Sequence, residues 1–311
     1  MTADYEDYRS VISAIGKLAR MILYVYLAAL CIRFFVLEAY QIPSQSMAPS
    51  LLTGDTLMVE KLSYGNRLSI FGWKIPGFYH PKHNEFAVFV SPAWKSPGFP
   101  KEVLSVLTLS VINLDNTYEM PKNLVKRVVA VPGDLVSMAN KVLSINGSAA
   151  DMKFVRTAVE IEYSRMVRSG FTDYDLFEEK YLDGRRIIQH YYGDRGFNAE
   201  EIYHFPQILV PAKGDIIALT NLTYFSAKIY RMLVARETGK KAEWLNGRIF
   251  LDGKEILAYR VHENYFWLMG DNRDVSEDGR SFGLVPESLI FGRPLFRYFP
   301  FSRASCQLNA K

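Results

Sequence analysis

Residues 41–61 read Gln-Ile-Pro-Ser-Gln-Ser-Met-Ala-Pro-Ser-Leu-Leu-Thr-Gly-Asp-Thr-Leu-Met-Val-Glu-Lys, and the rest of the chain is organised around this stretch. Pro43 and Pro49 bracket two serines, Ser44 and Ser46. Each proline lacks a backbone donor and biases the residue before it toward an extended conformation, so we expect a turn here and no helix. Serine and proline together are also typical of an ordinary surface loop. The serines become candidate nucleophiles only in combination with features found later in the chain.

The composition is that of a folded protein. The chain has 311 residues, of which 49% are hydrophobic, so it can bury one large or two ordinary domains and is not disordered. The net charge is +4 without a long basic run, so we expect no nucleic acid partner, whereas an anionic membrane surface suits this charge. Cys31 and Cys306 form neither a disulfide framework nor a zinc-ligand spacing, and both are expected to be free thiols.

Residues 18–37 predict a single transmembrane helix. A helix of about 20 residues spans the roughly 30 Å hydrocarbon core of a bilayer. Lys17 and Arg20 precede the apolar part, and positive side chains favour the cytoplasmic side. We therefore expect residues 1–17 to be a cytoplasmic arm and everything after Glu38 to lie on the outer side of the membrane.

Other interpretations of the apolar segments are less favoured. A cleaved signal peptide requires small residues at the exit, and Leu37 with Ala39 makes a poor site. Residues 289–301 are interrupted by Arg293 and Arg297, so they predict a terminal strand and not a second span.

The chain after the anchor is expected to be mainly β, in two parts, 38–150 and 207–311. A charged, partly helical inserted subdomain is expected at 151–206. Short apolar runs bounded by Gly and Pro predict strands at 56–59, 86–90, 124–131, 142–145, 216–220, 248–251 and 265–269.

Two further segments carry a structural prediction. A helix is expected over 221–238, ending at Gly239. Within 93–123, the apolar residues 103–114 are too few to span a membrane, so they predict a hairpin or a loop resting on the membrane.

Residues 124–134 read as a buried strand that ends in a Pro-Gly turn. Alternation places Lys126 on the same face as Leu124 and Val128. Lys126 and Arg127 could instead be an exposed basic pair on an edge strand, which is the commoner arrangement. Burial destabilises an ammonium group and lowers its pKa, so a buried Lys126 could act as a general base for a serine.

Three motifs occur in order along the chain. They are Ile42-Pro-Ser-x-Ser-Met-x-Pro-x-Leu with Gly54-Asp55, Lys126-Arg-Val with Pro132-Gly-Asp134, and Gly270-Asp-Asn-Arg-Asp-x-Ser-x-Asp-x-Arg280 with Gly283-x-Val-Pro286. Behind an N-terminal anchor, this set resembles bacterial type I signal peptidases. The resemblance covers roughly half of the chain and leaves the long insertions uncovered.

The resemblance implies a membrane-anchored serine endopeptidase with a Ser/Lys dyad on an all-β catalytic domain. Such an enzyme removes signal peptides from exported preproteins by cutting after small residues at the −3 and −1 positions. By the same resemblance, Ser46 is the nucleophile and Lys126 the general base. The backbone N–H of Ser46 and the hydroxyl of Ser44 would hold the oxyanion, and Ser276 would orient the lysine amine.

The resemblance also implies supporting and substrate-binding residues. An ion pair between Asp278 and Arg280 and a turn shaped by neighbouring polar side chains would support the dyad; the turn residues are Asp271, Asn272 and Arg273. Shallow apolar pockets would accept small substrate side chains; the residues expected to line them are Tyr40, Ile42, Met47, Leu51, Leu57 and Val125.

The implied location is the bacterial cytoplasmic (inner) membrane, with a single pass and the catalytic domain on the outer side. Only nine residues separate Leu37 from Ser46, so the nucleophile is expected within about 30 Å of the membrane. The implied partners are preproteins and the lipid bilayer, and the arrangement also admits the secretion translocon. No metal and no cofactor are expected.

The chain departs from the family pattern at a few positions. Gln45 stands where the family often has glycine, Ser50 where it often has threonine, and Gly279 where it often has serine. Asn84-Glu85 replaces a more usual Gly-Asp turn. These changes leave the chemistry of the implied dyad intact.

Other functions stay open from the sequence. One is a different Ser/Lys hydrolase, such as a self-cleaving regulator or a penicillin-binding protein, although the Ser-x-x-Lys motif of the latter is absent. Another is a non-enzymatic anchored scaffold for secretion. A Ser-His-Asp triad would need one of five histidines, none in a recognisable catalytic motif: His80, His83, His190, His204 and His262. The His80-x-x-His83 spacing is a weak metal signal without further ligands.

Overall fold

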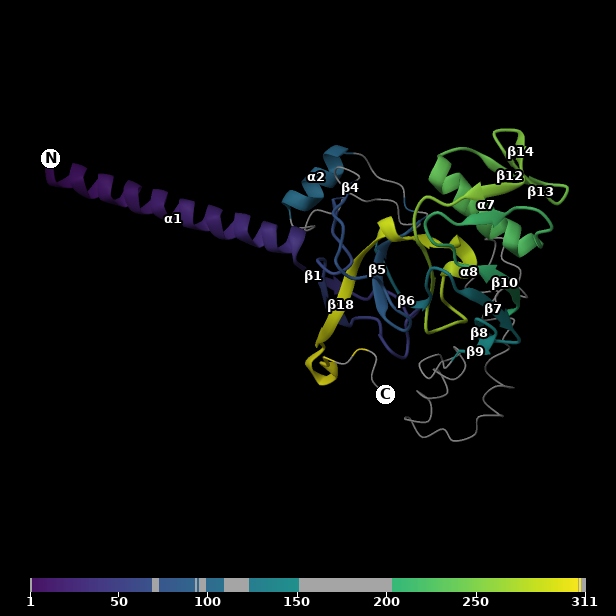
Figure 1. The fold of residues 1–311 in the computed structure, drawn as a ribbon. Helices are drawn as coiled ribbons and strands as arrows, with labels where there is room; N and C mark the ends of the chain where they lie inside the picture. Colours follow the sequence, from purple (N-terminus) through teal and green to yellow (C-terminus); the bar gives the residue numbers. More distant parts are fainter. Residues whose placement is uncertain are drawn as a thin grey trace.

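One long helix projects from a body made mostly of β-strands in the computed structural model (Figure 1). The structure describes residues 2–68, 73–92, 94, 99–108, 123–150, 203–306 and 308. The helices are α1 (Thr2–Phe35), α2 (Phe99–Leu107), α7 (Tyr224–Thr238) and α8 (Gly279–Phe282), with 3-10 turns η2 (Glu287–Leu289) and η3 (Phe301–Arg303). The expected fold class, a mainly β protein with an N-terminal apolar helix, is confirmed.

A seven-stranded antiparallel sheet forms the centre of the body. Its order is β1-β2-β18-β5-β6-β16-β17. The bounds are β1 (Leu37–Gln41), β2 (Thr56–Glu60), β18 (Ile290–Phe299), β5 (Phe86–Val90), β6 (Asn123–Ala130), β16 (Tyr265–Met269) and β17 (Val285–Pro286). Because β6 lies between β5 and β16, Lys126 and Arg127 sit in the interior of the sheet and not on an edge strand.

Smaller sheets surround the central one. A four-stranded sheet has the order β10 (Phe205–Leu209), β7 (Leu135–Ala139), β8 (Val142–Ile145) and β9 (Ser148–Ala149). A three-stranded sheet consists of β12 (Ala242–Leu245), β13 (Arg248–Leu251) and β14 (Lys254–Ile256). Two pairs complete the described strands: β11 (Ile216–Ala218) with β15 (Ala258–Arg260), and β3 (Arg67–Leu68) with β4 (Trp73–Lys74).

All seven strands expected from the sequence are present, with β11 two residues shorter than predicted. The expected helix over 221–238 begins at Tyr224, because the Thr223 side chain accepts a hydrogen bond from Ser226 N and starts the helix there. It ends as predicted at Gly239, whose φ of 67° is the left-handed cap that glycine adopts without strain.

The N-terminal helix is longer at its start and shorter at its end than the sequence indicated. Part of it, Ile12–Phe35, contains an 18-residue stretch with a mean hydropathy of 1.8 that is not buried inside the body, so it fits a membrane anchor. The backbone is already helical from Thr2, through the expected polar arm. Leu37, expected to end the helix, begins β1 instead, because it pairs in register with Glu60 of β2.

Two insertions were expected within the body. The stretch 103–114 was expected to be a hairpin or loop, and this is wrong for its first part, which is helical in α2 as far as Leu107. Residues 109–114 lie outside the described residues. The expected inserted subdomain also lies outside them as far as residue 202, and its last residues already belong to β10.

The junction between α1 and β1 is one residue long and tightly held. Lys61 N donates to Val36 O at 2.9 Å, and Lys61 Nζ donates to Arg33 O at 3.1 Å. Glu38 Oε1 pairs with Arg33 at 2.9 Å, and Glu38 Oε2 pairs with Lys61 at 2.6 Å. The Tyr40 hydroxyl donates to the same carboxylate at 2.6 Å. These bonds fix the end of the helix to the sheet.

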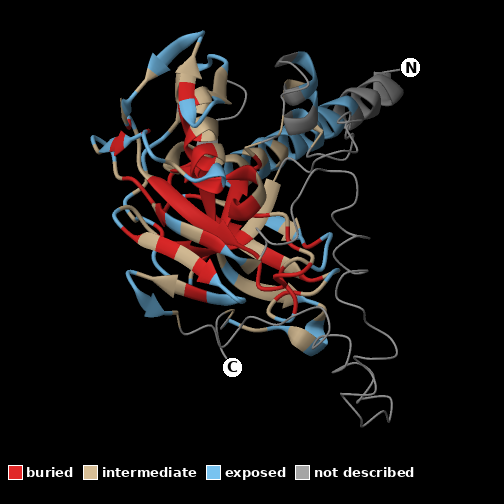
Figure 2. Cartoon of the chain, turned by 90° about the vertical axis from the view of Figure 1, so that its right-hand side faces the viewer, coloured by how far each residue is buried: buried red, intermediate tan, exposed pale blue. Residues whose placement is uncertain are grey.

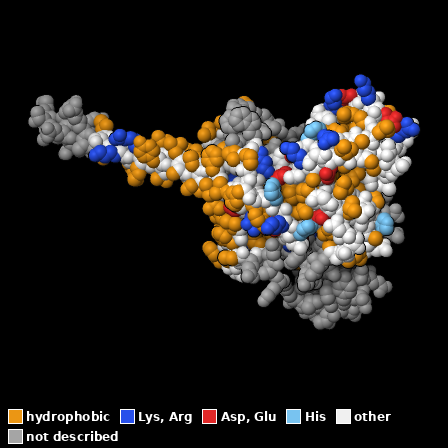
Figure 3. All heavy atoms as spheres, in the orientation of Figure 1, with side chains coloured by type: hydrophobic (Ala, Val, Ile, Leu, Met, Phe, Trp, Pro, Cys, Tyr) orange, Lys and Arg blue, Asp and Glu red, His pale blue; other side chains and the backbone are white. Residues whose placement is uncertain are grey.

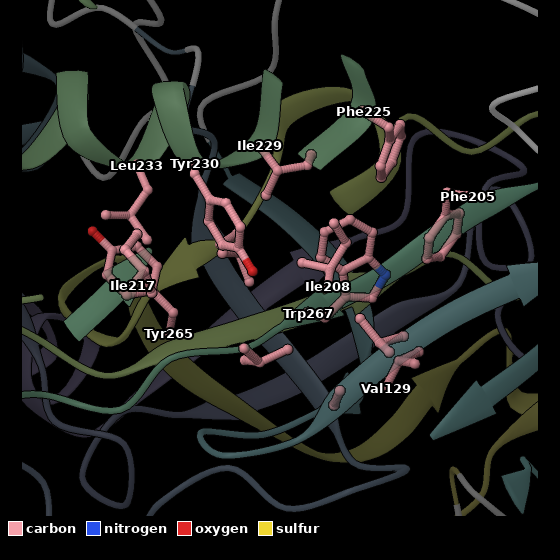
Figure 4. Packing of buried hydrophobic residues seen from close by; sticks show 14 of the residues in the cluster. Val129, Phe205, Ile208, Ile217, Phe225, Ile229, Tyr230, Leu233, Tyr265 and Trp267 are labelled. Carbon is pink, nitrogen blue, oxygen red and sulfur yellow. The ribbon is translucent and has the colours of Figure 1, made fainter. Parts of the chain in front are cut away.

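Buried residues are concentrated in the central sheet and the elements that pack on it (Figure 2). In one core cluster, side chains of α7 point toward the strands (Figure 4). Phe225 of α7 lies beside Trp267 of β16 and Phe205 of β10, with the two phenylalanine rings stacked at 5.1 Å. A second cluster lies beneath the Ser46 loop and contains Met47, Leu51 and neighbouring strand residues. The helix α7 therefore packs on the first of these core clusters, and the loop that carries Ser46 packs on the second.

Candidate active site

The loop that carries Ser46 leaves β1 and returns to β2. Its base is closed by Ile42 N donating to Asp55 O at 2.8 Å and by Gly54 N donating to Ile42 O at 2.9 Å. Met47 and Leu51 anchor it, being 1% and 0% exposed. No helix forms in the loop, as the two prolines predicted. Ser46 is thus held on a closed turn while its side chain stays partly accessible.

Lys126 of β6 reaches this turn from below. Its residue is 2% exposed, and its Nζ lies 2.6 Å from Ser46 Oγ. The same Nζ donates to Ser276 Oγ at 3.0 Å. On the open side, Ser44 Oγ donates to Ser46 Oγ at 3.3 Å. The structure therefore brings together the four residues that the sequence singled out, from three separate segments.

Burial lowers the pKa of Lys126 from its ordinary value of 10.5 to about 8. Asp278 opposes this shift and Arg280 adds to it. Within the described part of the chain, Lys126 forms no ion pair, since its hydrogen-bond partners are the two serine hydroxyls. A substantial fraction of this amine is therefore neutral at mildly alkaline pH, which an exposed lysine is not.

The loop that follows β16 supplies the support beneath Lys126. Asp278 and Arg280 form the expected ion pair, with Arg280 Nε 2.9 Å from Asp278 Oδ1. Burial alone would raise the pKa of Asp278, but the charge and hydrogen bonds of Arg280, together with the charges of Lys126 and Arg273, outweigh burial and hold this pKa below its usual range. The second carboxylate oxygen accepts from Gly270 N at 3.1 Å, so the pair also fixes the start of the loop.

Gly270 is required where the loop passes the two serines. A Cβ on Gly270 would lie 2.1 Å from Ser276 Oγ and 2.4 Å from Ser46 O. Asn272 then joins the loop to the nucleophile turn, because its N donates to Ser46 O at 3.1 Å and its Nδ2 to Gln45 O at 3.3 Å. The serine turn and the supporting loop are therefore in direct contact.

A buried ion pair behind the site was not recognised in the sequence. Arg127 and Asp271 are both 0% exposed and pair through two bonds, at 2.7 and 2.6 Å. Ser50 Oγ donates to the same Asp271 at 2.5 Å, and Arg127 NH1 donates to Asn84 O at 2.7 Å. Arg127 also lies over the ring of Phe86, 4.2 Å from its centroid. The sequence feature that could have indicated this pair is Arg127, the second basic residue in a strand that was expected to be buried.

Arg273, the remaining supporting residue, is also buried. Its NH1 donates to Met269 Sδ at 2.8 Å, and its backbone carbonyl accepts from Arg280 NH2 at 2.7 Å. Burial, and next the positive charge of Arg280, lower its pKa to about 10. Arg273 thus lies in a buried group of charged residues that act on its pKa, and a protonated Lys126 would add a further positive charge; the group is Arg127, Arg280, Asp271 and Asp278.

The six residues expected to line substrate pockets belong to one apolar cluster. Tyr40 and Val125 are partly buried and pack against the others. Leu51 and Leu57 are 0% exposed, so in this structure neither side chain is accessible to a substrate. Phe291 belongs to the same cluster and stacks obliquely on Tyr40 at 6.3 Å, a neighbour that the sequence did not indicate.

Three of the four described histidines pair with carboxylates, and the fourth, His204, is exposed; His190 lies outside the described residues. His80 pairs with Glu287 at 2.6 Å, His83 with Asp134 at 2.6 Å and His262 with Glu237 at 2.8 Å. None of these bonds involves a serine of the site, so they give no support to a Ser-His-Asp triad. Among the described residues, no group of three or more His, Cys, Asp or Glu side chains is placed to hold a metal ion.

Comparison with protein families matches residues 15–299 to the family described as signal peptidase, peptidase S26. Curated relatives agree along most of the chain. A signal peptidase I from Buchnera aphidicola subsp. Acyrthosiphon pisum is 25% identical over 281 residues, covering 90% of this chain and 73% of the relative. One from Helicobacter pylori (strain 26695) is 26% identical over 283 residues, covering 91% and 82%. One from Aquifex aeolicus is 24% identical over 285 residues, covering 88% and 80%.

Among solved structures, a signal peptidase I from Enterococcus faecalis V583 matches with a TM-score of 0.27 and 15% identity, covering 69% of this chain and 96% of that one.

Proposed function

Because the chain belongs to the signal peptidase (peptidase S26) family of serine proteases, we propose that it removes N-terminal signal peptides from exported preproteins through a Ser46/Lys126 dyad. The observation that carries the dyad is the 2.6 Å distance between Ser46 Oγ and the amine of a lysine that is 2% exposed. A partly accessible hydroxyl beside a buried amine of lowered pKa is the combination that a nucleophile and its base require.

In the proposed reaction, neutral Lys126 accepts the proton of the Ser46 hydroxyl while Ser46 Oγ attacks the scissile carbonyl carbon. The negative charge formed on the carbonyl oxygen is held by the Ser46 N–H and the Ser44 hydroxyl. Such positioned donors are each worth on the order of 3 kcal/mol in the transition state. When the tetrahedral intermediate collapses, protonated Lys126 gives its proton to the leaving amine, which departs as the new N-terminus of the mature protein.

The acyl-enzyme that remains is an ester of Ser46. Lys126, neutral again, takes a proton from water, and the resulting hydroxide attacks the ester carbonyl. Collapse of this second intermediate releases the signal peptide as a carboxylic acid and returns the proton to Ser46. Ser276, 3.0 Å from the lysine Nζ, keeps the amine aimed at Ser46 throughout.

Selection of small residues at the −3 and −1 positions is assigned to the apolar cluster beside Ser46. Of the six residues expected to bind substrate, Tyr40 and Val125 are partly exposed, whereas the fully buried Leu51 and Leu57 would limit the depth of the site. A shallow site of this kind would exclude large side chains by overlap.

The proposed setting is the bacterial cytoplasmic membrane, with the N-terminus in the cytoplasm and the body on the outer side. Bacterial signal peptidase I relatives and the apolar helix Ile12–Phe35 fit a membrane-anchored enzyme. The one-residue junction after α1 holds the Ser46 loop near the end of the anchor. Preproteins and the bilayer are therefore the proposed partners, and the secretion translocon is a further one that this setting allows.

The nucleophile assignment is tested with Ser46→Ala. We expect complete loss of preprotein cleavage with unchanged membrane insertion and melting temperature, because one partly exposed hydroxyl is removed from a turn held by other contacts. The measurement is cleavage of a preprotein by the purified full-length protein in detergent, with sequencing of the new N-terminus. Turnover by the variant, after contaminating peptidase is excluded, would overturn the assignment.

The matched comparison is Ser44→Ala, which removes a hydroxyl two residues away. One oxyanion donor is lost while the nucleophile stays, so we expect a loss of about 100- to 1,000-fold in kcat. If both variants are equally inactive but correctly folded, the division of roles between the two serines is wrong. If both retain full activity, the anchored scaffold becomes the better explanation of the chain.

A further inference from the structure

The short helix α2 contacts the membrane-spanning part of α1. The Tyr26 hydroxyl donates a hydrogen bond to the backbone carbonyl of Leu107, the last residue of α2. Tyr26 lies inside the apolar segment Ile12–Phe35. Figure 1 shows α2 beside the end of α1 that joins the body. The contact therefore places the end of α2 at a definite position along the anchor.

That position lies well inside the bilayer if α1 spans it. Tyr26 is nine residues before Phe35, and a helix rises about 1.5 Å per residue, so the Tyr26 backbone lies about 13 Å along α1 from the body, and its hydroxyl reaches Leu107. The nine residues of α2 are themselves about 13 Å long. A helix of this length is as long as the distance along α1 from the junction to Tyr26.

The sequence of α2 becomes more apolar toward its C-terminal end, which is the end that contacts Tyr26. Its first half contains Lys101 and Glu102, whereas Val103–Leu107 has serine as its one polar residue. Lys101 is exposed, and Leu104 and Leu107 are 38% and 51% exposed. A lysine at the interface can extend its amine toward water while its stem stays in an apolar layer.

Two of the last backbone carbonyls of α2 accept hydrogen bonds from protein donors. Leu104 O accepts from both Thr108 N at 2.9 Å and Thr108 Oγ1 at 2.8 Å, and Leu107 O accepts from Tyr26. The last carbonyls of a helix in water can remain solvated, but in hydrocarbon each one needs an internal partner. Figure 3 shows hydrophobic side chains gathered along α1 and over the body where α1 joins it.

We propose that α2 is a second membrane-inserted element, which enters the hydrocarbon beside α1 with Leu107 deepest and Lys101 at the interface. Its partner is the layer of lipid acyl chains. This inference rests on α1 being the membrane anchor. In this arrangement the body is attached to the membrane through two helices, α1 and α2, and not through α1 alone.

The test measures the depth of single positions in full-length protein reconstituted in phosphatidylethanolamine and phosphatidylglycerol vesicles. A Cys31→Ser, Cys306→Ser background receives Lys101→Cys, Leu104→Cys or Leu107→Cys, each labelled with an environment-sensitive fluorophore. We expect the label at Leu107 to emit at shorter wavelength and to be quenched by lipids brominated in the acyl chain. The label at Lys101 should be quenched by aqueous iodide, with Leu104 between them.

Two controls separate the possible failures. A protein with only native Cys31 labelled reports on α1, so iodide quenching at Cys31 would mean that the anchor assignment fails. Protection at Cys31 with iodide quenching at Leu107 would overturn the insertion of α2 alone, as would a Leu107 label quenched by neither agent. Tyr26→Phe removes the hydrogen bond and keeps the ring, and should move the Leu107 label toward iodide without affecting Cys31.

Discussion

The environment of Lys126 in the folded protein destabilises its protonated form. It sits in an interior strand of the sheet, 2% exposed, where the nearby charges that act on it include Asp278, Arg280 and Asp271. Taking an ammonium group out of water is costly unless it is paired, and here the direct partners are neutral hydroxyls. The same burial that makes Lys126 a candidate base therefore reduces the stability of the protein.

The pH dependence of cleavage follows from the lowered pKa of Lys126. With a pKa of about 8, about one tenth of the lysine is neutral at pH 7, and nearly all of it is neutral at pH 9. We expect kcat/KM for a short Ala-x-Ala peptide to rise with pH and to level off above about pH 8 to 9. The measurement is a profile from pH 5 to 11 in detergent. A rate that is independent of pH below 8 would exclude Lys126 as the base.

Lys126→Met separates the catalytic role from the structural one. Activity should be lost, while the melting temperature at pH 7 should stay the same or rise, because an apolar chain of similar length fills the same site. Folding lowers the pKa of Lys126 from 10.5 to about 8, which corresponds to about 3 kcal/mol of destabilisation at neutral pH.

The stability difference should itself depend on pH. The folded wild-type protein binds fewer protons than the unfolded chain between about pH 8 and 10.5, so its stability rises through that window. The advantage of Lys126→Met should therefore be largest below pH 8 and should shrink as the pH approaches 10.5. An exposed lysine would give no such trend, and an active methionine variant would remove the dyad altogether.

At the scale of elements, three segments far apart in the sequence form the site. The loop after β16 is the segment in which added side-chain atoms would meet the closest contacts. Gly270 passes close to both Ser276 and Ser46. Gly279 packs against the Leu268 carbonyl and the Trp267 ring, and a Cβ at position 279 would lie 3.0 Å from the carbonyl oxygen and 3.1 Å from the ring. The absence of serine at position 279 is thus explained by the large Trp267 beside it.

Gly270→Ala should disable the site without a change in its chemical groups. The added methyl group would overlap Ser276 Oγ at 2.1 Å and Ser46 O at 2.4 Å, so both serines must shift from the positions in which they contact Lys126. We expect a loss of at least about 100-fold in kcat, as for a misplacement of about 1 Å. Gly279→Ala is the matched control in the same loop, where the overlap is milder and the methyl meets Trp267 and Leu268. Equal activity of the two variants would show that the close approach at Gly270 is unimportant.

The strands with strong alternation and the helix with its caps were predictable because their signals are local. Tyr265–Met269 and Phe86–Val90 were found with their correct bounds, and Gly239 ends α7 as expected. The strand β1 was missed, because Leu37–Gln41 becomes a strand only by pairing with β2. The α2 stretch was ambiguous, since a short apolar run fits a helix, a strand or a loop equally well.

The site shows the same division. The motifs indicated Ser46, Lys126 and Ser276 as residue types in order, and the geometry brings them together. The pairing of Arg127 with Asp271 could not be predicted from either neighbourhood, because it joins residues 144 positions apart and depends on both being fully buried. Breaking such a pair by removing one partner typically costs about 3 to 5 kcal/mol, so it holds β6 and the supporting loop in one piece.

At the scale of the whole molecule, the proposed topology places α1 across the membrane and the body on the outer side. A protease added to sealed spheroplasts should digest the body while a tag fused before Thr2 remains intact. Detergent lysis is the control, because it should expose the tag as well. Digestion of the tag in sealed cells, with a protected body, would put the active site on the side where exported preproteins have not yet crossed.

The bonded, one-residue junction between α1 and the sheet governs how enzyme and substrate meet. Only Val36 separates Phe35 from Leu37, and Lys61 and Glu38 hold both sides of it, so the body cannot swing freely about its anchor. In the proposed topology, a preprotein held in the same bilayer by its own apolar segment approaches by lateral diffusion in a plane. The active site then meets every substrate at the same distance from the membrane surface and in a similar orientation. A soluble protease loses rotational freedom each time it binds a substrate, whereas in this protein that freedom is already restricted when the chain folds.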